Sequence, residues 1–507
     1  MKRSLVVIFG VLFLHGILCV SGVEGAFGKS LRERLILADS TFDFSSGVRL
    51  TSREKNADAA LSRLRSAYFQ RFALHPDLPH RTPFLVSRSD LKLERLHRVL
   101  RTMPKGGLLH VHATATGSVE WIVERALSMP DCCIYWEETN DRYVHGQLGF
   151  FPNGCAPAGW MLLTKLKAAH PNIREELEAL FSLGPEDLGC PDMWKEFETI
   201  FARIDGFISY RPVFLDYYRD AFERLAGDNI QFLELRTSLD PVLTEDGGQV
   251  VDEAIIDLYQ SIVEKVRTKY QGFDLAVIVC SYRQASIGEV RAKMTLERKL
   301  AAKYPEMIVG FDMVGEEDRG RSNHYYAAAL GSVPAVPLFL HAGESLSPTN
   351  HNVLDAWLLG SQRIAHAINL VHFPALERRI RDSGTVLELC PISNQSLGYV
   401  PDLRLHPGRG YLLRGIRCVL GSDDPAIFRN EGLTDDFWEA YIAWGLDLRS
   451  LKHLTGNSIL YSNLPPLLVK RHLETFTRRW NTFIRAVNAT ESQGKGTSNA
   501  QPEAVAP

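Results

Sequence analysis

The amino-acid sequence predicts an α/β fold, a parallel (β/α)8 TIM barrel. Eight apolar runs alternate with amphipathic helical stretches, and strands that are buried on both faces lose the polar alternation of a one-sided sheet. Polar residues also follow the apolar part of nearly every run, where the catalytic face of a barrel lies. This feature favours the barrel over a doubly wound open sheet. The runs are 106–113, 230–238, 274–282, 308–315, 337–344, 363–371, 385–393 and 417–425.

The composition sets limits on the function. With 45% hydrophobic residues in 507, the chain can bury a large core. Its net charge of −3 gives no electrostatic reason to expect nucleic acid as a partner.

The first residues have the layout of a signal peptide. Lys2 and Arg3 precede the apolar run Leu5–Val20, and small residues follow from Ser21 to Ala26. We expect residues 1–25 to be removed, with cleavage somewhere after Gly22 to Ala26, and the protein to be secreted. A membrane anchor is the alternative, but the run is short for a span and no stop-transfer pattern follows.

The barrel domain is expected over residues 101–490, with additions at three places. Residues 27–100 are helical and charged, and their periodicity fits either a packing arm or a dimerisation element. The gap between the first two strands is too long for one crossover, so residues 127–185 are expected to form an inserted subdomain over the barrel mouth. Residues 491–507 are low in apolar content and are expected to be disordered.

The cysteines and sequons fit an oxidising compartment. One loop-closing disulfide is expected from Cys132 or Cys133 to Cys155. Buried thiols are expected at Cys280, Cys390 and Cys418. The sequon at Asn488 is expected to be exposed, whereas that at Asn394 follows a buried strand and is not expected to be glycosylated.

Four strand ends carry residues suited to a metal. His110 and His112 are two residues apart, so both imidazoles point to one face of a strand. With His341 and Asp423 they supply three imidazoles and one carboxylate, a set that suits zinc with a position left for water. Each residue alone has a simpler interpretation, such as a core histidine or a helix start at Asp423. Their joint occurrence at strand ends favours the metal site.

Further polar residues lie at the same strand ends. Glu344 follows His341 by three positions and could transfer protons, although a first-turn helix acid is the simpler alternative. His366 could orient a hydroxide or stabilise developing charge. Asp424 could face a substrate from the turn before Pro425.

The motifs resemble the adenosine deaminase superfamily, in particular its secreted, growth-factor-related type. The resemblance covers nearly the whole mature chain. It is carried by MPKGGLLHVH, HAGE, R-I-x-H, ELCPISNQ and GSDDPAIF, and it extends through MWKEFETIF, FISYRPVFLDYY, FLELR, VGFDMVGEEDRG and DLRLHP.

This resemblance implies hydrolytic attack of hydroxide at C6 of adenosine, releasing inosine and ammonia. One Zn²⁺ per chain would be bound by His110, His112, His341 and Asp423, with Glu344 as proton donor and His366 positioning the hydroxide. Asp424 and the Gly315 backbone would contact the base, and Trp194 and Phe197 would line the pocket. The N-terminal helices would form a homodimer. The insert would meet a cell-surface receptor, and a glycosaminoglycan is a further expected partner.

The chain departs from the family pattern on the substrate side. The family commonly has an acid that reaches the sugar where this chain has Ala113, a histidine at Tyr282, and glycines at Ala365 and Ala367. Loss of the acid is expected to weaken adenosine binding by about 1–3 kcal/mol unless another group substitutes. These changes favour an alternative, a secreted signalling or nucleoside-binding protein with little turnover. A different amidohydrolase with two metals ranks last, because no strand-end lysine is present to bridge them.

Overall fold

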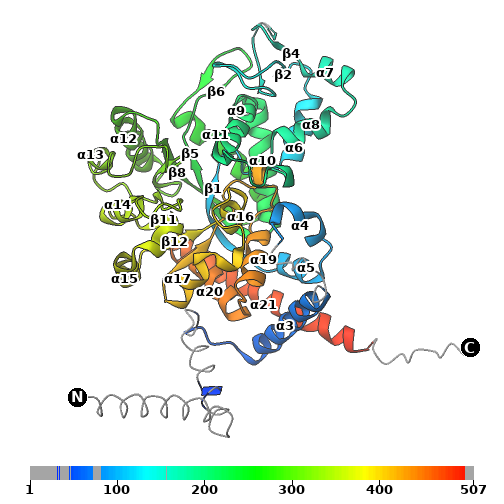
Figure 1. Cartoon of the computed structure of the whole chain (residues 1–507), viewed down its shortest axis with the longest axis vertical. Helices are drawn as coiled ribbons and strands as arrows, with labels where there is room; N and C mark the ends of the chain where they lie inside the picture. Colours follow the sequence, from blue (N-terminus) through cyan, green and yellow to red (C-terminus); the bar gives the residue numbers. More distant parts are fainter. Residues whose placement is uncertain are drawn as a thin grey trace, which may run out of the picture.

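The computed structural model describes residues 31, 33–34, 45, 47–71, 82–152, 154–155 and 157–496, with the backbone alone for 490–496 (Figure 1). The expected signal peptide and the last residues of the expected tail lie outside this range. Helix α21 (Pro466–Gly496) continues past residue 490, where the tail was expected to begin.

Two parallel four-stranded sheets form the centre of the molecule. Their orders are β1-β5-β8-β9 and β10-β11-β12-β13. Parallel bridges of Phe311 with Leu338 and of Val111 with Asp423 link the two sheets at both edges, as an eight-stranded barrel requires. The predicted fold class is confirmed. The strands are β1 (Gly106–His112), β5 (Ile230–Thr237), β8 (Asp274–Tyr282), β9 (Ile308–Val314), β10 (His341–Ala342), β11 (Arg363–His366), β12 (Val386–Leu389) and β13 (Cys418–Leu420).

In the second sheet the strands are shorter than the apolar runs that predict them. Pro391 begins α16 (Pro391–Ser396), and Pro425 begins α18 (Pro425–Phe428), because proline fits the first turn of a helix and cannot continue a strand ladder. At Ala367 the backbone is left-handed (φ 52°), and the short helix η2 (Ile368–His372) follows. The runs therefore end in short helices instead of continuing as strands.

Helices cover the outside of the strands. They form where local signals favour them: a capping box of Ser286 and Glu289 begins α12, and Gly384, at φ 74°, ends α15. The helices between strands and after β13 are α10 (Arg211–Gly227), α11 (Glu253–Lys269), α12 (Ile287–Lys303), α13 (Ala327–Leu330), α14 (Asn352–Leu358), α15 (Pro374–Ser383), α17 (Pro407–Leu413), α19 (Thr434–Ala443) and α20 (Leu448–Leu460).

The segment between β1 and β5 contains structure of its own. After α6 (Val119–Ser128), the antiparallel strands β2 (Cys133–Tyr135), β3 (Leu148–Gly149) and β4 (Trp160–Leu162) pair in the order β3-β2-β4. Helices α7 (Leu163–Ala169), α8 (Ile173–Leu180) and α9 (Met193–Ile208) follow. This small sheet lies at the opposite end of the molecule from α3 (Ser52–Arg71) and α21 (Figure 1).

The structure decides which cysteine pairs with Cys155. Cys133 forms the disulfide, with Cα atoms 5.7 Å apart. Its neighbour Cys132 belongs to the main hydrophobic core, because successive side chains of a strand point to opposite faces. Cys280, Cys390 and Cys418 are buried free thiols.

The N-terminal helices pack on the C-terminal end of the chain. Glu54 of α3 accepts hydrogen bonds from Lys452 Nζ (2.6 Å) and Trp480 Nε1 (2.8 Å). Helices α4 (Phe84–Leu91) and α5 (Arg95–Arg101) follow and lead into β1. Among the described residues, no helix combines the length and apolar character needed to cross a membrane.

Candidate active site

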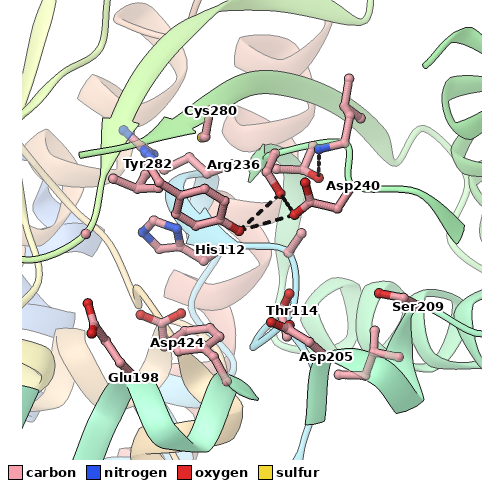
Figure 2. Close-up of a pocket in the computed structure, with 18 of the residues that line it drawn as sticks. His112, Thr114, Glu198, Asp205, Ser209, Arg236, Asp240, Cys280, Tyr282 and Asp424 are labelled. Carbon is pink, nitrogen blue, oxygen red and sulfur yellow. Dashed lines mark hydrogen bonds between the residues drawn. The ribbon is translucent and has the colours of Figure 1, made fainter. Parts of the chain in front are cut away.

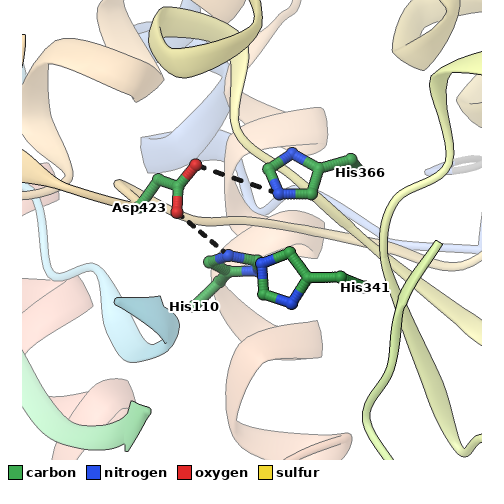
Figure 3. Close-up of side chains that lie close together, drawn as sticks. All are labelled: His110, His341, His366 and Asp423. Carbon is green, nitrogen blue, oxygen red and sulfur yellow. Dashed lines mark ion pairs between the residues drawn. The ribbon is translucent and has the colours of Figure 1, made fainter. Parts of the chain in front are cut away.

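Four histidines and one aspartate converge at the carboxyl ends of the strands. We call His110, His112, His341, His366 and Asp423 the histidine cluster. Figure 3 shows four of its members facing one another. His110 and His112 end β1, His341 begins β10, His366 ends β11 and Asp423 follows β13. All are buried except His112, which is partly exposed.

The distances bring the predicted metal ligands together. Nε2 of His110 and Nε2 of His112 each lie 3.2 Å from Oδ1 of Asp423. The ring of His341 lies 4.8 Å from that of His110 and 5.1 Å from that of His112, centroid to centroid. His366 approaches as well, with Nε2 3.8 Å from Asp423 Oδ2.

Neighbouring carboxylates orient two of these rings. Nδ1 of His110 lies 2.9 Å from Glu388 Oε2, and Nδ1 of His341 lies 2.7 Å from Asp312 Oδ2. A carboxylate on Nδ1 leaves Nε2 as the ligand atom. Nε2 of His110 is buried and has no hydrogen-bond partner. Imidazole nitrogens held in this way beside a carboxylate fit Zn²⁺.

Two arginines connect these carboxylates. Arg236 donates to Asp312 (2.8 Å) and to Glu388 (2.6 Å), and Arg363 donates to Glu388 (2.6 Å) and pairs with Glu234. Burial alone would raise the pKa of Glu388, but Arg236 and Arg363 hold it well below its usual range. The pKa of Asp312 is held low in the same way by His341 and Arg236. The cluster thus rests on a buried charge network.

No role was predicted for Arg236, Asp312 or Glu388. A usable signal was present in the sequence, since each is a charged residue within a mainly apolar run. Isolated buried charges are costly, so such residues must find partners in the fold.

Two residues of the cluster have strained backbones. His366 has φ 62° and Asp423 has φ 60°, both in the left-handed region that side chains other than glycine seldom adopt. Such strain persists where packing holds it and is common at functional sites.

Glu344 lies beside the cluster. Its backbone N–H donates to Glu317 (2.9 Å), and its Oε1 is 3.3 Å from both Asn394 Nδ2 and His366 Nδ1. Burial, with the charges of Asp423 and Glu317, raises its pKa well above the usual value. A raised pKa favours the protonated form of this carboxyl, which suits a proton donor.

Asn394 links Glu344 to His366. Its Nδ2 donates to Nδ1 of His366 (3.0 Å), which places the proton of the neutral imidazole on Nε2, the atom that faces Asp423. The side-chain amide is fully buried and also contacts His406 (3.1 Å). The second sequon is thus inaccessible in the folded protein.

A cavity of about 650 Å³ opens beside the cluster, and the predicted substrate-contacting residues Trp194, Phe197, Gly315 and Asp424 all line it (Figure 2). Trp194 Nε1 donates to the Tyr399 hydroxyl (2.5 Å), and Phe197 stacks on Phe428 with centroids 5.5 Å apart. Asp424 is buried, and its Oδ1 has no hydrogen-bond partner.

Of the four positions expected to differ from the family pattern, two line the cavity and two lie in the core. Ala113 and Tyr282 line the cavity, and the Tyr282 hydroxyl lies 3.2 Å from Asp240 Oδ2 and 3.3 Å from Ser238 Oγ. Ala365 and Ala367 are fully buried on either side of His366.

Comparisons with known proteins agree with this geometry. The adenosine deaminase family model matches residues 187–474. The chain is 33% identical to adenosine deaminase 2 of Sus scrofa over 89% of this chain and 93% of the relative. It is 31% identical to adenosine deaminase 2 of Homo sapiens over 91% and 95%.

Solved structures share the fold at low sequence identity. The N6-methyl-AMP deaminase of Arabidopsis thaliana has a TM-score of 0.57 at 15% identity, covering 75% of this chain and 98% of that one. A Zn-bound amidohydrolase of Burkholderia ambifaria has a TM-score of 0.58 at 16% identity, covering 78% and 95%. With the extent of the sequence matches, the chain belongs to the adenosine deaminase family of hydrolytic aminohydrolases.

Proposed function

We propose that the protein is a secreted, zinc-dependent deaminase that converts adenosine, or a related purine nucleoside, to inosine and ammonia. The observation that carries this proposal is the position of Glu344 beside the histidine cluster, with Oε1 3.3 Å from His366 Nδ1, at the wall of a cavity that can hold a nucleoside. The names of the curated relatives support adenosine as the substrate.

One Zn²⁺ per chain would be held by His110, His112, His341 and Asp423. The buried Nε2 of His110, which makes no hydrogen bond and faces Asp423, supports this assignment, as do the carboxylates behind two of the rings. When bound, the ion supplies Lewis acidity that makes water a nucleophile at neutral pH.

The remaining residues would bind the base and move protons. Glu344 donates a proton to the purine ring as water adds to C6. The proton on Nε2 of His366 points toward Asp423 and orients the attacking oxygen by hydrogen bonding. Asp424, whose pKa is raised well above normal by burial and by Asp423, would contact the base, as would the Gly315 backbone, and both line the cavity.

Secretion follows from the pattern of the first 25 residues. The Cys133–Cys155 disulfide supports it, since such bonds persist in oxidising compartments. By family resemblance, the helices of residues 27–100 would form a homodimer. The insert would bind a cell-surface receptor, and a glycosaminoglycan would be a further partner.

A second function, nucleoside binding or signalling with little turnover, is favoured by Ala113 and Tyr282. Both line the cavity at positions where the family pattern differs.

The test is a deaminase assay on metal-analysed protein. The fall in ultraviolet absorbance as adenosine becomes inosine would be followed for the natural chain and for Glu344→Gln. Bound zinc with turnover that disappears in the variant supports the deaminase. Bound zinc without turnover, but with nucleoside binding, supports the second function, and absence of zinc contradicts the metal assignment.

A further inference from the structure

The cavity extends well beyond the histidine cluster. The side chains of Thr114, Asp205, Ser238, Asp240 and Tyr282 line it with polar groups, and we call these five residues the distal wall. Figure 2 labels all of them except Ser238. Thr114 follows β1, Asp205 comes from α9, Ser238 and Asp240 follow β5, and Tyr282 ends β8. A substrate whose reacting carbon lies at the histidine cluster must place its other end against this wall.

Asp205 is the residue of the distal wall that best indicates what kind of ligand binds there. Protein surrounds it closely enough to raise its pKa to about 7, yet the side chain stays accessible from the cavity. The side chain of Thr114 lies close to the carboxylate and acts to lower its pKa. Within the described part of the chain, no cationic side chain pairs with Asp205. Its free lone pairs therefore face the cavity as hydrogen-bond acceptors.

A second acceptor stands across from it. Asp240 Oδ2 accepts hydrogen bonds from the Tyr282 hydroxyl (3.2 Å) and from the Ser238 hydroxyl. All these contacts are made to hydroxyl groups, and a carboxylate has about four lone-pair sites. Asp240 can therefore accept a further hydroxyl from a ligand.

The charge of the cavity restricts that ligand. Among the described lining residues, the only guanidinium or ammonium group is Arg236, which is buried and bound to Asp312 and Glu388. The distal wall thus offers acceptors without a free cation. It suits neutral, hydroxyl-rich groups, and it disfavours a phosphate.

We propose that Asp205, positioned by Thr114, binds a sugar hydroxyl of the substrate and substitutes for the carboxylate absent at Ala113. This inference rests on the proposed function, and it assigns the substrate to the nucleosides rather than to free bases or nucleotides. Asp205 is a specificity residue, because it contacts the sugar and not the reacting carbon.

Equilibrium binding to the zinc-loaded, full-length protein separates these possibilities. Inosine, 2′-deoxyinosine, 3′-deoxyinosine and hypoxanthine would be titrated calorimetrically into the natural protein, Asp205→Asn and the control Asp141→Asn, an exposed aspartate in the insert. We expect Asp205→Asn to weaken the binding of inosine about 10-fold and to leave the binding of hypoxanthine unchanged. One of the two deoxynucleosides should also be unaffected by the substitution, because it lacks the hydroxyl that Asp205 contacts.

A structural role would give another pattern. Equal weakening of all four ligands, or no change in any, overturns the assignment of Asp205 while leaving the deaminase intact. Failure of the natural, zinc-loaded protein to bind any of them contradicts the proposed function instead. Thr114→Val keeps the Asp205 carboxylate but removes the hydroxyl that positions it, and should show the same ligand dependence at about 2- to 3-fold. It decides the question if Asp205→Asn does not fold.

Discussion

Behind the histidine cluster, Glu388 and Asp312 each contact a histidine and an arginine, whereas on the distal wall of the cavity Asp205 and Asp240 contact only hydroxyl groups. The first pair is fully buried and its pKa values are held low by paired cations. The second pair is accessible from the cavity, and the pKa of Asp205 is raised.

This contrast fits the expected departures at Ala113 and Tyr282, which line the cavity, but not those at Ala365 and Ala367, which are buried on either side of His366. A substitution within the buried network would leave an uncompensated charge, which costs several kcal/mol. A substitution on the distal wall leaves a group that water or a neighbouring hydroxyl can satisfy. The reacting end is therefore constrained by the fold, while the substrate end can change with the ligand.

The largest loss of activity should appear for Glu344→Gln. The amide keeps the shape of the side chain and removes its proton, so we expect kcat to fall by about 1000-fold or more. Activity would be followed by the absorbance assay. Zinc content and the unfolding temperature should stay unchanged, and a loss of bound zinc would instead show that Glu344 holds the site together.

Breaking the network behind the metal site should affect both metal and stability. Glu388→Gln removes the charge that meets His110, Arg236 and Arg363. We expect metal affinity to fall about 10- to 100-fold and the free energy of unfolding to fall by about 3–5 kcal/mol. Metal titration and denaturant unfolding measure the two effects.

A surface pair provides the control for this variant. Glu377 pairs with the half-exposed Arg414, and Glu377→Gln should cost less than about 1 kcal/mol without altering metal binding. Equal losses in the two variants would contradict the role of the network.

On the distal wall, Tyr282→Phe should have a smaller effect. It removes the hydroxyl that contacts Asp240 and Ser238. We expect KM for adenosine to change by about 2- to 10-fold, with kcat and zinc content unaltered. Steady-state kinetics checks this, and a large fall in kcat would show that the distal wall takes part in the chemistry.

The smallest effect concerns pH and stability. Because the pKa of Asp205 is raised from 3.8 to about 7, the folded state holds a proton that the unfolded chain has lost between these values. This carboxyl therefore lowers stability as pH rises from about 4 to 7. In ligand-free protein, Asp205→Asn should raise the unfolding temperature by about 1 °C above pH 7. Near pH 4 the unfolding temperature should not change.

Glu388 behaves in the opposite sense. Its pKa is lowered on folding, so the stability it contributes is present above the usual glutamate range and is lost as pH falls below it. Melting curves of Asp205→Asn, Glu388→Gln and the natural protein against pH compare both carboxylates. If Asp205→Asn raised the unfolding temperature at low pH alone, the result would contradict a raised pKa for Asp205.

Much of this molecule was determined by local sequence. The alternation of apolar runs and amphipathic helices predicted the barrel, because each element buries the face that its own periodicity defines. The two-residue spacing of His110 and His112 placed both rings on one side of a strand for the same reason. His341, Glu344, His366 and Asp423 were found because polar residues gather at the carboxyl ends of parallel strands.

Only the tertiary structure decided which groups meet. Arg236, Asp312 and Glu388 lie on three strands far apart in sequence, and their charges became interpretable when the strands were placed side by side. Asp205 reaches Thr114 from a helix. Local periodicity specifies the direction of a side chain but not its partner across the fold, because the partner depends on distances that only packing sets.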